Sequence, residues 1–442
     1  FLFTKTAECI AHICFIGQKK KEAGGKAMAI IVPFQCIHPA PEYAAQVAAL
    51  PYDVYNRKEA AKVTANHPLS FLNIDRPETQ FPPDADMYAP QVYKKANELL
   101  QSWLQRGVLE KETERGYALY EQTMNKRTQT GLVACASLDD YCEQVIRRHE
   151  NTRPEKEEDR VRHIDACSAQ TGPIFLAYRK NAVIQEITGR VKCGAPHFDF
   201  VAEDGIRHRG WSITDPEQIK AIQTAFAGID RIYIADGHHR AASAVRVGLQ
   251  RRREHPDYDG TEEFNYFLSV LFPDEELQIL DYNRVVKDLN GRTPKELLQE
   301  AEKVFEVRPC AGSGEALHAE LHRKGELLLY LADRWYHLTI RPEYRKDDPV
   351  DGLDVSILQN AFLHPVLGIG DPKTDPRIGF VGGIRGYQEL ERRVHEDCAA
   401  AFAMYPTSIQ ELFAVADAGR LMPPKSTWFE PKLRSGLYIH AF

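Results

Sequence analysis

The sequence lacks the features that mark several specialised classes of protein. Its nine cysteines are scattered and form no Cys-x-x-Cys pair, which argues against a zinc ribbon or a disulfide framework and favours reduced thiols in a cytoplasmic protein. No apolar run reaches the length of a membrane-spanning helix, and a net charge of −7 gives no overall attraction to nucleic acid. We therefore expect neither a membrane nor a nucleic acid among the partners, and the sequence leaves the oligomeric state open.

The composition is that of an ordinary globular protein. With 442 residues, of which 43% are hydrophobic and 27% are charged, the chain is long enough for two or three domains. Patterns typical of strands and helices alternate through most of it, which predicts an α/β (α+β) fold. A charged tract at residues 251–260 suggests one boundary. The expected parts are an N-terminal region with helices (28–130), a central core (131–255) and a C-terminal α/β domain (260–442).

The beginning of the chain differs from the rest. It does not open with Met, whereas Met28 precedes a sequence that resembles a natural start. Its basic cluster at residues 19–21 follows the apolar part, and a signal peptide has the opposite order. We expect residues 1–27 to be a disordered extension. Elsewhere we expect strands at 117–124, 131–137, 174–178, 232–235, 264–272, 327–340 and 437–442, and helices at 216–226, 294–305 and 353–363.

The most informative segment is residues 231–244. Its apolar run at 232–235 predicts a buried strand, which Asp236 and Gly237 end just before an Ala-rich helix. Such a turn directs free backbone N–H groups and the positive end of the helix dipole at one point. An anion or nucleotide phosphate is the favoured ligand, because adjacent histidines point to different sides of a helix and disfavour a two-histidine metal site. The alternative is a structural junction at which Asp236 caps the helix. The side chains gathered here are Asp236, His238, His239 and Arg240.

A second segment, residues 149–155, also opens a helix. Thr152 and Glu155 have the spacing of a capping box, and Pro154 stands where a first helical turn tolerates it. Capping does not account for Glu150, which stands just outside and beside His149. A carboxylate there suits a general base, provided that the fold brings it near the strand–helix turn.

A third segment, residues 422–432, combines basic and hydroxyl side chains with prolines. This chemistry suits a phosphate or a carboxylate, and a solvated loop anchored by aromatic residues is an equal alternative. The Gly-rich segment at 368–374 lacks the Gly-Lys-Ser/Thr ending of a P-loop, and we expect a turn there. The candidate ligands in 422–432 are Lys425, Ser426, Thr427 and Lys432.

The first two segments together carry a resemblance. A His-Glu-x-Thr at a helix start, followed by strand-Asp-Gly-His-His-Arg-helix, resembles the free-serine kinases of the ParB/sulfiredoxin-like superfamily over roughly residues 131–250. The resemblance implies a ParB/sulfiredoxin-like core that uses ATP or ADP with Mg²⁺. It implies that Glu150 is the base and that Thr152 assists. By motif, Asp236 to Arg240 line the phosphates, and we expect Gly237, His238 and Arg240 to bind them. From the phosphoryl chemistry we expect Asp236 and His239 to be catalytic and Asp236 to be a possible Mg²⁺ ligand. The 422–432 segment adds Lys425 and Ser426 as further phosphate-binding candidates.

A wider resemblance covers residues 28–442. The segments 51–54, 66–72, 147–156, 233–240, 379–384 and 422–432 are similar to hallmark motifs of a bacterial family of unknown function, DUF1015. The narrower resemblance implies phosphoryl transfer between ATP or ADP and a small hydroxy-amino acid, with free L-serine as the expected substrate. Two alternatives remain. One is a non-catalytic CTP-binding switch of ParB type, since Gly237 and Arg240 match its Gly-x-x-Arg turn, and the other is a phosphate-ester hydrolase. His238 stands where sulfiredoxins have their catalytic cysteine, which argues against that activity.

Overall fold

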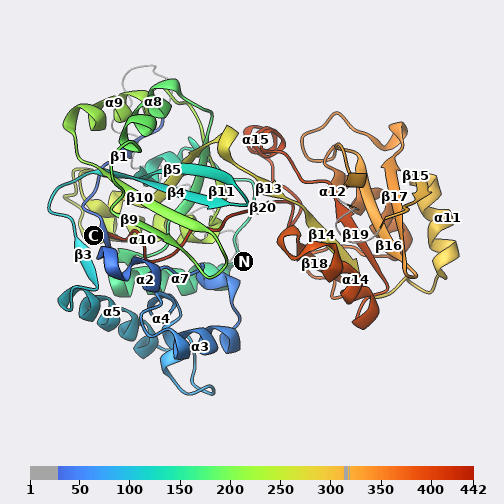
Figure 1. Cartoon of the computed structure of the whole chain (residues 1–442), viewed down its shortest axis with the longest axis horizontal. Coiled ribbons are helices and arrows are strands. Elements are labelled where there is room, and N and C mark those ends of the chain that lie inside the picture. Colours follow the sequence, from blue (N-terminus) through green and yellow to red (C-terminus); the bar gives the residue numbers. More distant parts are fainter. Residues whose placement is uncertain (1–27, 313–316, 318) are drawn as a thin grey trace. The chain divides into compact units, whose positions relative to one another are not determined.

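The computed structural model describes residues 28–442 except 313–316 and 318 (Figure 1). The expectation for residues 1–27 therefore lies outside the described part. The chain forms two compact units. The first unit runs to Glu276 and includes Pro431–Phe442, and the second unit is Leu277–Glu430. The predicted α/β class is confirmed, because each unit combines a sheet with helices.

The boundaries expected at residue 130 and near residue 255 are wrong. The strands β4 (Tyr117–Met124) and β5 (Arg127–Ser137) form a hairpin in the first unit, so the sheet runs across residue 130. The next strand, β12 (Tyr266–Pro273), pairs with β5 and belongs to the same sheet. The charged tract at 251–260 is therefore the end of a helix and a loop inside one unit.

The first unit is built on a mixed nine-stranded sheet. Its order is β6-β11-β8-β12-β5-β4-β10-β9, with β1 added to β5. The neighbours β6 and β11 are parallel, as are β8 and β12, and the other pairs are antiparallel. The strands not yet given are β1 (Ile31–Val32), β6 (Ile146–Arg147), β8 (Ile174–Tyr178), β9 (Phe198–Val201), β10 (Arg207–Ile213) and β11 (Ile232–Asp236).

Strand β11 leads to the strand–helix turn and lies inside the sheet. Its residues Ile232, Tyr233 and Ile234 are fully buried, and β8 beside it is buried along its whole length. A strand covered on both faces needs such a continuous apolar run. The predictions of strands at 174–178 and 232–235 are confirmed. The other helices of this part are α8 (Ala182–Val191) and α9 (Pro216–Phe226), the second of which was expected.

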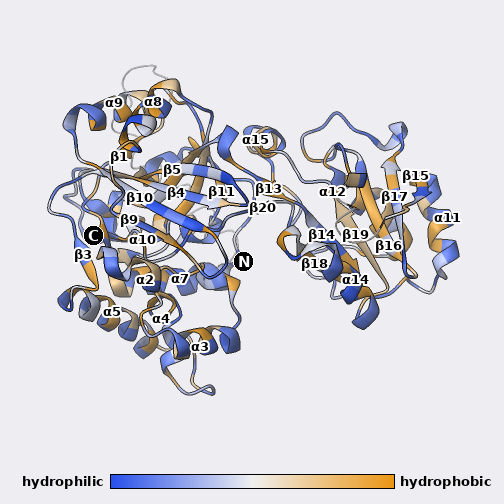
Figure 2. Ribbon diagram, viewed as in Figure 1, coloured by the Kyte–Doolittle hydropathy of each residue, from blue (hydrophilic) through white to orange (hydrophobic). Residues whose placement is uncertain are grey.

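Helices near the N-terminus form a second core in the first unit. Asn56 and Glu59 make a capping box at the start of α3 (Arg57–Asn66), in agreement with their spacing in the sequence. In α5 (Pro90–Gln105), Ala96 and Leu100 are buried, and Figure 2 shows that this helix also carries hydrophilic residues, as an amphipathic surface helix does. The short helices α2 (Ala44–Val47), α4 (Leu72–Asp75) and α6 (Leu138–Cys142) complete this unit together with α7 (Pro154–Cys167) and α10 (His238–Glu254).

The last twelve residues return from the second unit to the first. Ile439 pairs with Ile37 and Ser435 with Ala49 through backbone hydrogen bonds. Of the strand expected at 437–442, only β21 (His440–Ala441) forms, paired with β7 (Ala169–Gln170), although 437–440 are buried as expected. This return segment places three polar side chains, Lys432, Arg434 and Ser435, inside the first unit.

The second unit contains an antiparallel six-stranded sheet of order β15-β17-β16-β19-β14-β18. The strand pattern at 327–340 is a hairpin, because Ala332 and Asp333 both have positive φ, as a tight two-residue turn requires. The expected helices at 294–305 and 353–363 are confirmed. The strands are β14 (Tyr282–Val286), β15 (Phe305–Pro309), β16 (Glu326–Leu331), β17 (Arg334–Ile340), β18 (Ile378–Gly382) and β19 (Ala400–Met404). The longer helices are α11 (Pro294–Val304), α14 (Gly386–Glu396) and α15 (Ile409–Asp417). The short helix α12 (Asp354–Leu358) is continued by a π-helical turn.

The described residues bear on two expectations from the sequence, which concern the cysteines and membrane-spanning helices. Every cysteine in the described part of the chain is a free thiol, in agreement with the expectation of reduced cysteines. None of the helices in 28–442, outside the short undescribed stretches, is long and apolar enough to cross a membrane.

The return segment also sets a pH dependence through His208. His208 is fully buried, hydrogen-bonds Tyr120 through Nδ1 at 2.8 Å, and accepts from Arg434 Nε at 3.4 Å. Burial, with help from the Arg434 charge, lowers the pKa of His208 to about 3. Between pH values of about 6.5 and about 3, the unfolded chain binds a proton at His208 that the folded chain does not bind. The free energy of unfolding therefore decreases as the pH is lowered, by up to about 1.4 kcal/mol per pH unit.

We therefore predict that His208→Gln reduces the pH dependence of stability. The thermal unfolding midpoint of the wild-type chain should drop between pH 7 and pH 5, and the drop should be smaller in the variant. The partly exposed His67 provides the control, and His67→Gln should leave the wild-type drop unchanged. Equal drops for His208→Gln and the wild type would show that His208 is not held neutral.

Candidate active site

The strand–helix turn forms as the sequence predicts. Gly237 is the N-cap of α10 and has φ +92°, a left-handed conformation that favours glycine. It has no side chain to accept hydrogen bonds from the first-turn N–H groups, and the first turn holds no acidic residue. The positive end of this 17-residue helix is therefore not compensated from within the helix.

Asp236 is fixed by two contacts. Its Oδ1 accepts a hydrogen bond from Gly237 N at 2.8 Å, and its Oδ2 lies 3.1 Å from Lys432 Nζ. Burial alone would raise the pKa of Asp236, but the charges of Lys432 and Arg240 outweigh burial and hold the pKa well below its usual range. The alternative that Asp236 caps the helix is wrong, because the N-cap residue is Gly237.

The candidate ligands predicted in residues 422–432 belong to different units, because the boundary between the units falls within this segment. Lys432 belongs to the first unit and reaches Asp236. Lys425 and Ser426 belong to the second unit, where Lys425 Nζ lies 5.5 Å from the centre of the Tyr282 ring and Ser426 Oγ donates to Pro423 O at 2.7 Å. The cofactor-binding roles of Lys425 and Ser426 therefore stay predictions.

Arg240 lies beneath the turn, with its side chain only 11% exposed. Nη1 donates to Pro173 O, and Nη2 is 3.9 Å from Asp236 Oδ2. A Cβ atom added to Gly237 would lie 3.0 Å from Arg240 Nε, which is closer than ordinary packing. Glycine therefore serves two purposes at residue 237, since it permits the positive φ and lets the guanidinium approach the backbone.

The two adjacent histidines carry no positive charge near neutral pH. His238 packs edge-on against His149 at 4.5 Å between ring centres, and His149 N donates to His238 Nε2 at 3.5 Å. Burial lowers the pKa of His149 to about 4 and the pKa of His238 well below its usual value. The positive charges at the turn are therefore those of Arg240 and Lys432.

His239 joins the two predicted segments. Its Nε2 accepts a hydrogen bond from Arg153 N at 2.9 Å, and burial lowers the pKa of its ring. Ser243 Oγ, one turn later, donates to Glu157 O at 3.0 Å in α7. Because His149 and Arg153 both contact α10, the loop that contains half-buried Glu150 lies against the start of α10.

The start of α7 differs from the expectation in one detail. Its N-cap is Arg153, which forms no side-chain cap, and Pro154 occupies the first turn as predicted. The capping box of Thr152 with Glu155 is wrong. Thr152 Oγ1 donates instead to Glu157 Oε2 at 3.0 Å, so Thr152 stiffens the loop that follows Glu150 rather than capping the helix.

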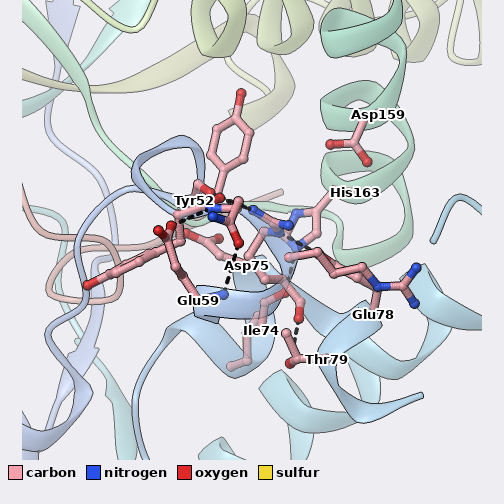
Figure 3. A network of polar contacts seen from close by, with 12 residues as sticks. Tyr52, Glu59, Ile74, Asp75, Glu78, Thr79, Asp159 and His163 are labelled. Atoms are coloured by element: carbon pink, nitrogen blue, oxygen red, sulfur yellow. Dashed lines mark hydrogen bonds and ion pairs between the residues drawn. The ribbon is translucent and has the colours of Figure 1, made fainter. Parts of the chain in front are cut away.

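A polar cavity that the sequence did not reveal shares Arg240 with the turn. It has about 410 Å³ of empty space, its open mouth included. Figure 3 shows a network of polar contacts at this cavity, in which Tyr52, Asp75 and His163 come together from three separate segments. Tyr52 stands in the 51–54 motif, but no local sequence pattern marks Asp75 or His163 as a site residue. Its polar lining includes Tyr52, Asp75, Arg160, Thr171, Arg240 and Ser435.

A metal role for Asp236 stays a prediction. No group of three or more His, Cys, Asp or Glu residues in the described chain is placed to hold an ion. Both oxygens of Asp236 already have partners, Gly237 N and Lys432 Nζ. An ion at Asp236 would therefore take most of its ligands from phosphates and water.

Solved structures with distant similarity include two proteins of known identity. A free serine kinase variant in complex with AMP has a TM-score of 0.33 and 15% identity, over 70% of this chain and 92% of that one. A C-terminally truncated SbnI from Staphylococcus aureus has a TM-score of 0.34 and 11% identity, over 69% and 85%. A conserved hypothetical protein from Pyrococcus furiosus has 0.30 and 13%, over 70% and 95%.

The family comparison covers most of the chain. Among proteins with curated descriptions, none matches. The model of the family described as "Protein of unknown function (DUF1015)" matches residues 31–356, which include the strand–helix turn, the Glu150 loop and most of the polar cavity. The chain therefore belongs to the DUF1015 family.

Proposed function

We propose that this site transfers a phosphoryl group between a nucleotide, ATP or ADP, and the hydroxyl group of a small amino acid, with free L-serine as the expected acceptor. The observation that carries the proposal is the contact between two segments distant in sequence. The loop with Glu150 lies against the start of α10 through Arg153 N and His239 Nε2. The start of α10 combines an uncapped helix end with Arg240 and Lys432.

The groups divide the work of phosphoryl transfer. The first-turn N–H groups of α10, Arg240 and Lys432 hold the phosphates and offset their negative charge, which is the largest contribution to such reactions. Glu150 takes the proton of the acceptor hydroxyl. That oxygen forms the new bond to phosphorus as the bond to the bridging oxygen breaks, so ATP leaves as ADP, or ADP as AMP. His238 and His239 are neutral and hold the two segments in place.

One assay separates this proposal from its alternatives. The full chain is incubated with ATP, ADP or CTP, with and without L-serine, and the products are identified by mass spectrometry. Phosphoserine formed together with ADP or AMP is the expected result. Binding of CTP without any product would instead indicate a nucleotide switch. Release of inorganic phosphate without phosphoserine would indicate a hydrolase, and either outcome would overturn the proposal.

A further inference from the structure

The polar cavity contains a buried carboxylate, that of Asp75. Asp75 is 2% exposed, and Thr171 Oγ1 donates to its Oδ1 at 2.8 Å. Among the residues that the structure describes, no lysine or arginine makes a salt bridge with this carboxylate. Burying an ionised carboxylate costs free energy unless a positive charge or several hydrogen bonds compensate it. The cavity beside Asp75 is therefore suited to a cationic group.

The other charge in the same wall is already paired. Arg160 is buried, its Nε and Nη2 lie 3.0 and 2.8 Å from Asp159 Oδ2, and its Nη1 donates to the backbone oxygen of Asp75 at 3.3 Å. Its guanidinium also stacks over the Tyr52 ring at 4.1 Å. Asp159 and Tyr52 thus hold Arg160 in place, where its charge attracts the Asp75 carboxylate without forming a salt bridge with it.

A second cation borders the cavity on the side of the strand–helix turn. Arg240 lines it together with Ser435, which is 2% exposed. The backbone at Gly172 comes so close that an added Cβ would lie 3.2 Å from Ser435 Oγ and 3.6 Å from Arg240 Cδ. The wall thus presents a guanidinium and a hydroxyl at one place and the Asp75 carboxylate at another.

We propose that this cavity binds the amino-acid acceptor as a zwitterion, with the α-ammonium group at Asp75 and the α-carboxylate at Arg240 and Ser435. This inference rests on the proposed function, of which it names the second substrate site. A simple anion would meet the Asp75 carboxylate, and a simple cation would meet two arginines, whereas a small molecule with both charges satisfies both. Because Arg240 also borders the turn, one side chain connects the acceptor pocket with the phosphate site.

Calorimetric titration of the full chain tests the charge pattern. L-Serine and glycine, which carry both charges, are expected to bind. L-Lactate, which lacks the ammonium group, is expected to bind at least about 10-fold more weakly than L-serine, since it loses a charge-assisted hydrogen bond. Equal binding of L-lactate and L-serine, or no binding of either amino acid, would overturn the proposal without any variant being needed.

The variant Asp75→Asn tests the residue assignment. It keeps an oxygen for the Thr171 hydroxyl but removes the negative charge, so L-serine affinity should fall at least about 10-fold while ADP affinity stays within about 2-fold. Asp140→Asn is the matched control, since Asp140 is also buried, but it accepts from Ile30 N and does not line the cavity. Its L-serine affinity should equal that of the wild type.

The two proposals fail in different ways. If the wild type makes phosphoserine and Asp75→Asn has an unchanged KM for L-serine, the pocket assignment is wrong and the proposed function stands. If L-serine binds in an Asp75-dependent manner but no phosphoserine forms with any nucleotide, the pocket stands and the proposed function is wrong.

Discussion

Glu150→Gln is expected to lower the rate of phosphoryl transfer by about 100- to 10,000-fold, the usual contribution of a general base. The amide has nearly the shape of the carboxylate but cannot accept the hydroxyl proton. Glu150 lies in the loop beside the start of α10, whereas the charges assigned to phosphate binding are Arg240 and Lys432. Nucleotide affinity, measured by calorimetry with ADP, should therefore stay within about 2-fold of the wild type, because no phosphate contact is removed.

The control for this variant is a nearby glutamate with no assigned role. Glu155 is exposed in the first turn of α7, and Glu155→Gln should retain the wild-type transfer rate. A Glu150→Gln variant with more than half of the wild-type rate would contradict the assignment of the base. An equal loss in both variants would instead point to a disturbance of the start of α7.

Lys432→Met is expected to weaken nucleotide binding by about 10- to 100-fold, which corresponds to the loss of one charge-assisted hydrogen bond. The ammonium group has two effects at the turn. It offers a positive charge to phosphate, and it pairs with the Asp236 carboxylate at 3.1 Å. Without it the pKa of Asp236 moves upward, and at neutral pH the remaining carboxylate repels the phosphates. The loss should be larger at low ionic strength, because salt screens the attraction between the ammonium group and the incoming nucleotide.

A second paired lysine controls for the loss of an ion pair as such. Lys192 forms a salt bridge with Glu121 in the same unit and does not contact the turn. Lys192→Met should keep the wild-type ADP affinity, measured by calorimetry at two salt concentrations. If Lys432→Met binds ADP as tightly as Lys192→Met does, Lys432 serves only to neutralise Asp236.

The sequence predicted the parts of the candidate site that depend on local pattern. The run at 232–235 followed by Asp236 and Gly237 could be recognised as a strand, a sharp turn and a helix, because each step follows from the conformational preferences of its own residues. The same holds for Pro154 at the start of α7. The contact between the two segments could not be predicted from the sequence, and the hydrogen bond from Arg153 to His239 shows it. The position of the Glu150 carboxylate at the turn stays a prediction.

The parts that depend on long-range packing could not be predicted. Tyr52, Asp75, Arg160 and Arg240 meet at one cavity although up to 188 residues separate them in sequence, from residue 52 to residue 240. Tyr52 and Arg240 stand in recognisable motifs, but Asp75 and Arg160 stand in no pattern that distinguishes a pocket from an ordinary buried polar residue. Burial also changed the chemistry, since the pKa of His238 falls mainly because the tertiary structure removes its ring from water.

The domain boundary shows a related limit of local reasoning. Residues 422–432 read as one loop, yet the chain passes from the second unit to the first between Glu430 and Pro431. Lys432 therefore reaches Asp236, whereas Lys425 and Ser426 make their contacts within the second unit. Composition does not reveal this point, because the return is determined by the pairing of Ser435 and Ile439 with Ala49 and Ile37, far back in the sequence.

The central claim is that the Glu150 loop and the start of α10 form one phosphoryl-transfer site. Phosphorus NMR of the full chain with ATP or ADP and L-serine tests it most directly, because phosphoserine, inorganic phosphate and the nucleotides give separate signals in one spectrum. The account predicts a phosphoserine signal that grows as ATP or ADP is consumed and is lost in Glu150→Gln. A nucleotide that binds without yielding phosphoserine, or that yields only inorganic phosphate, would contradict it.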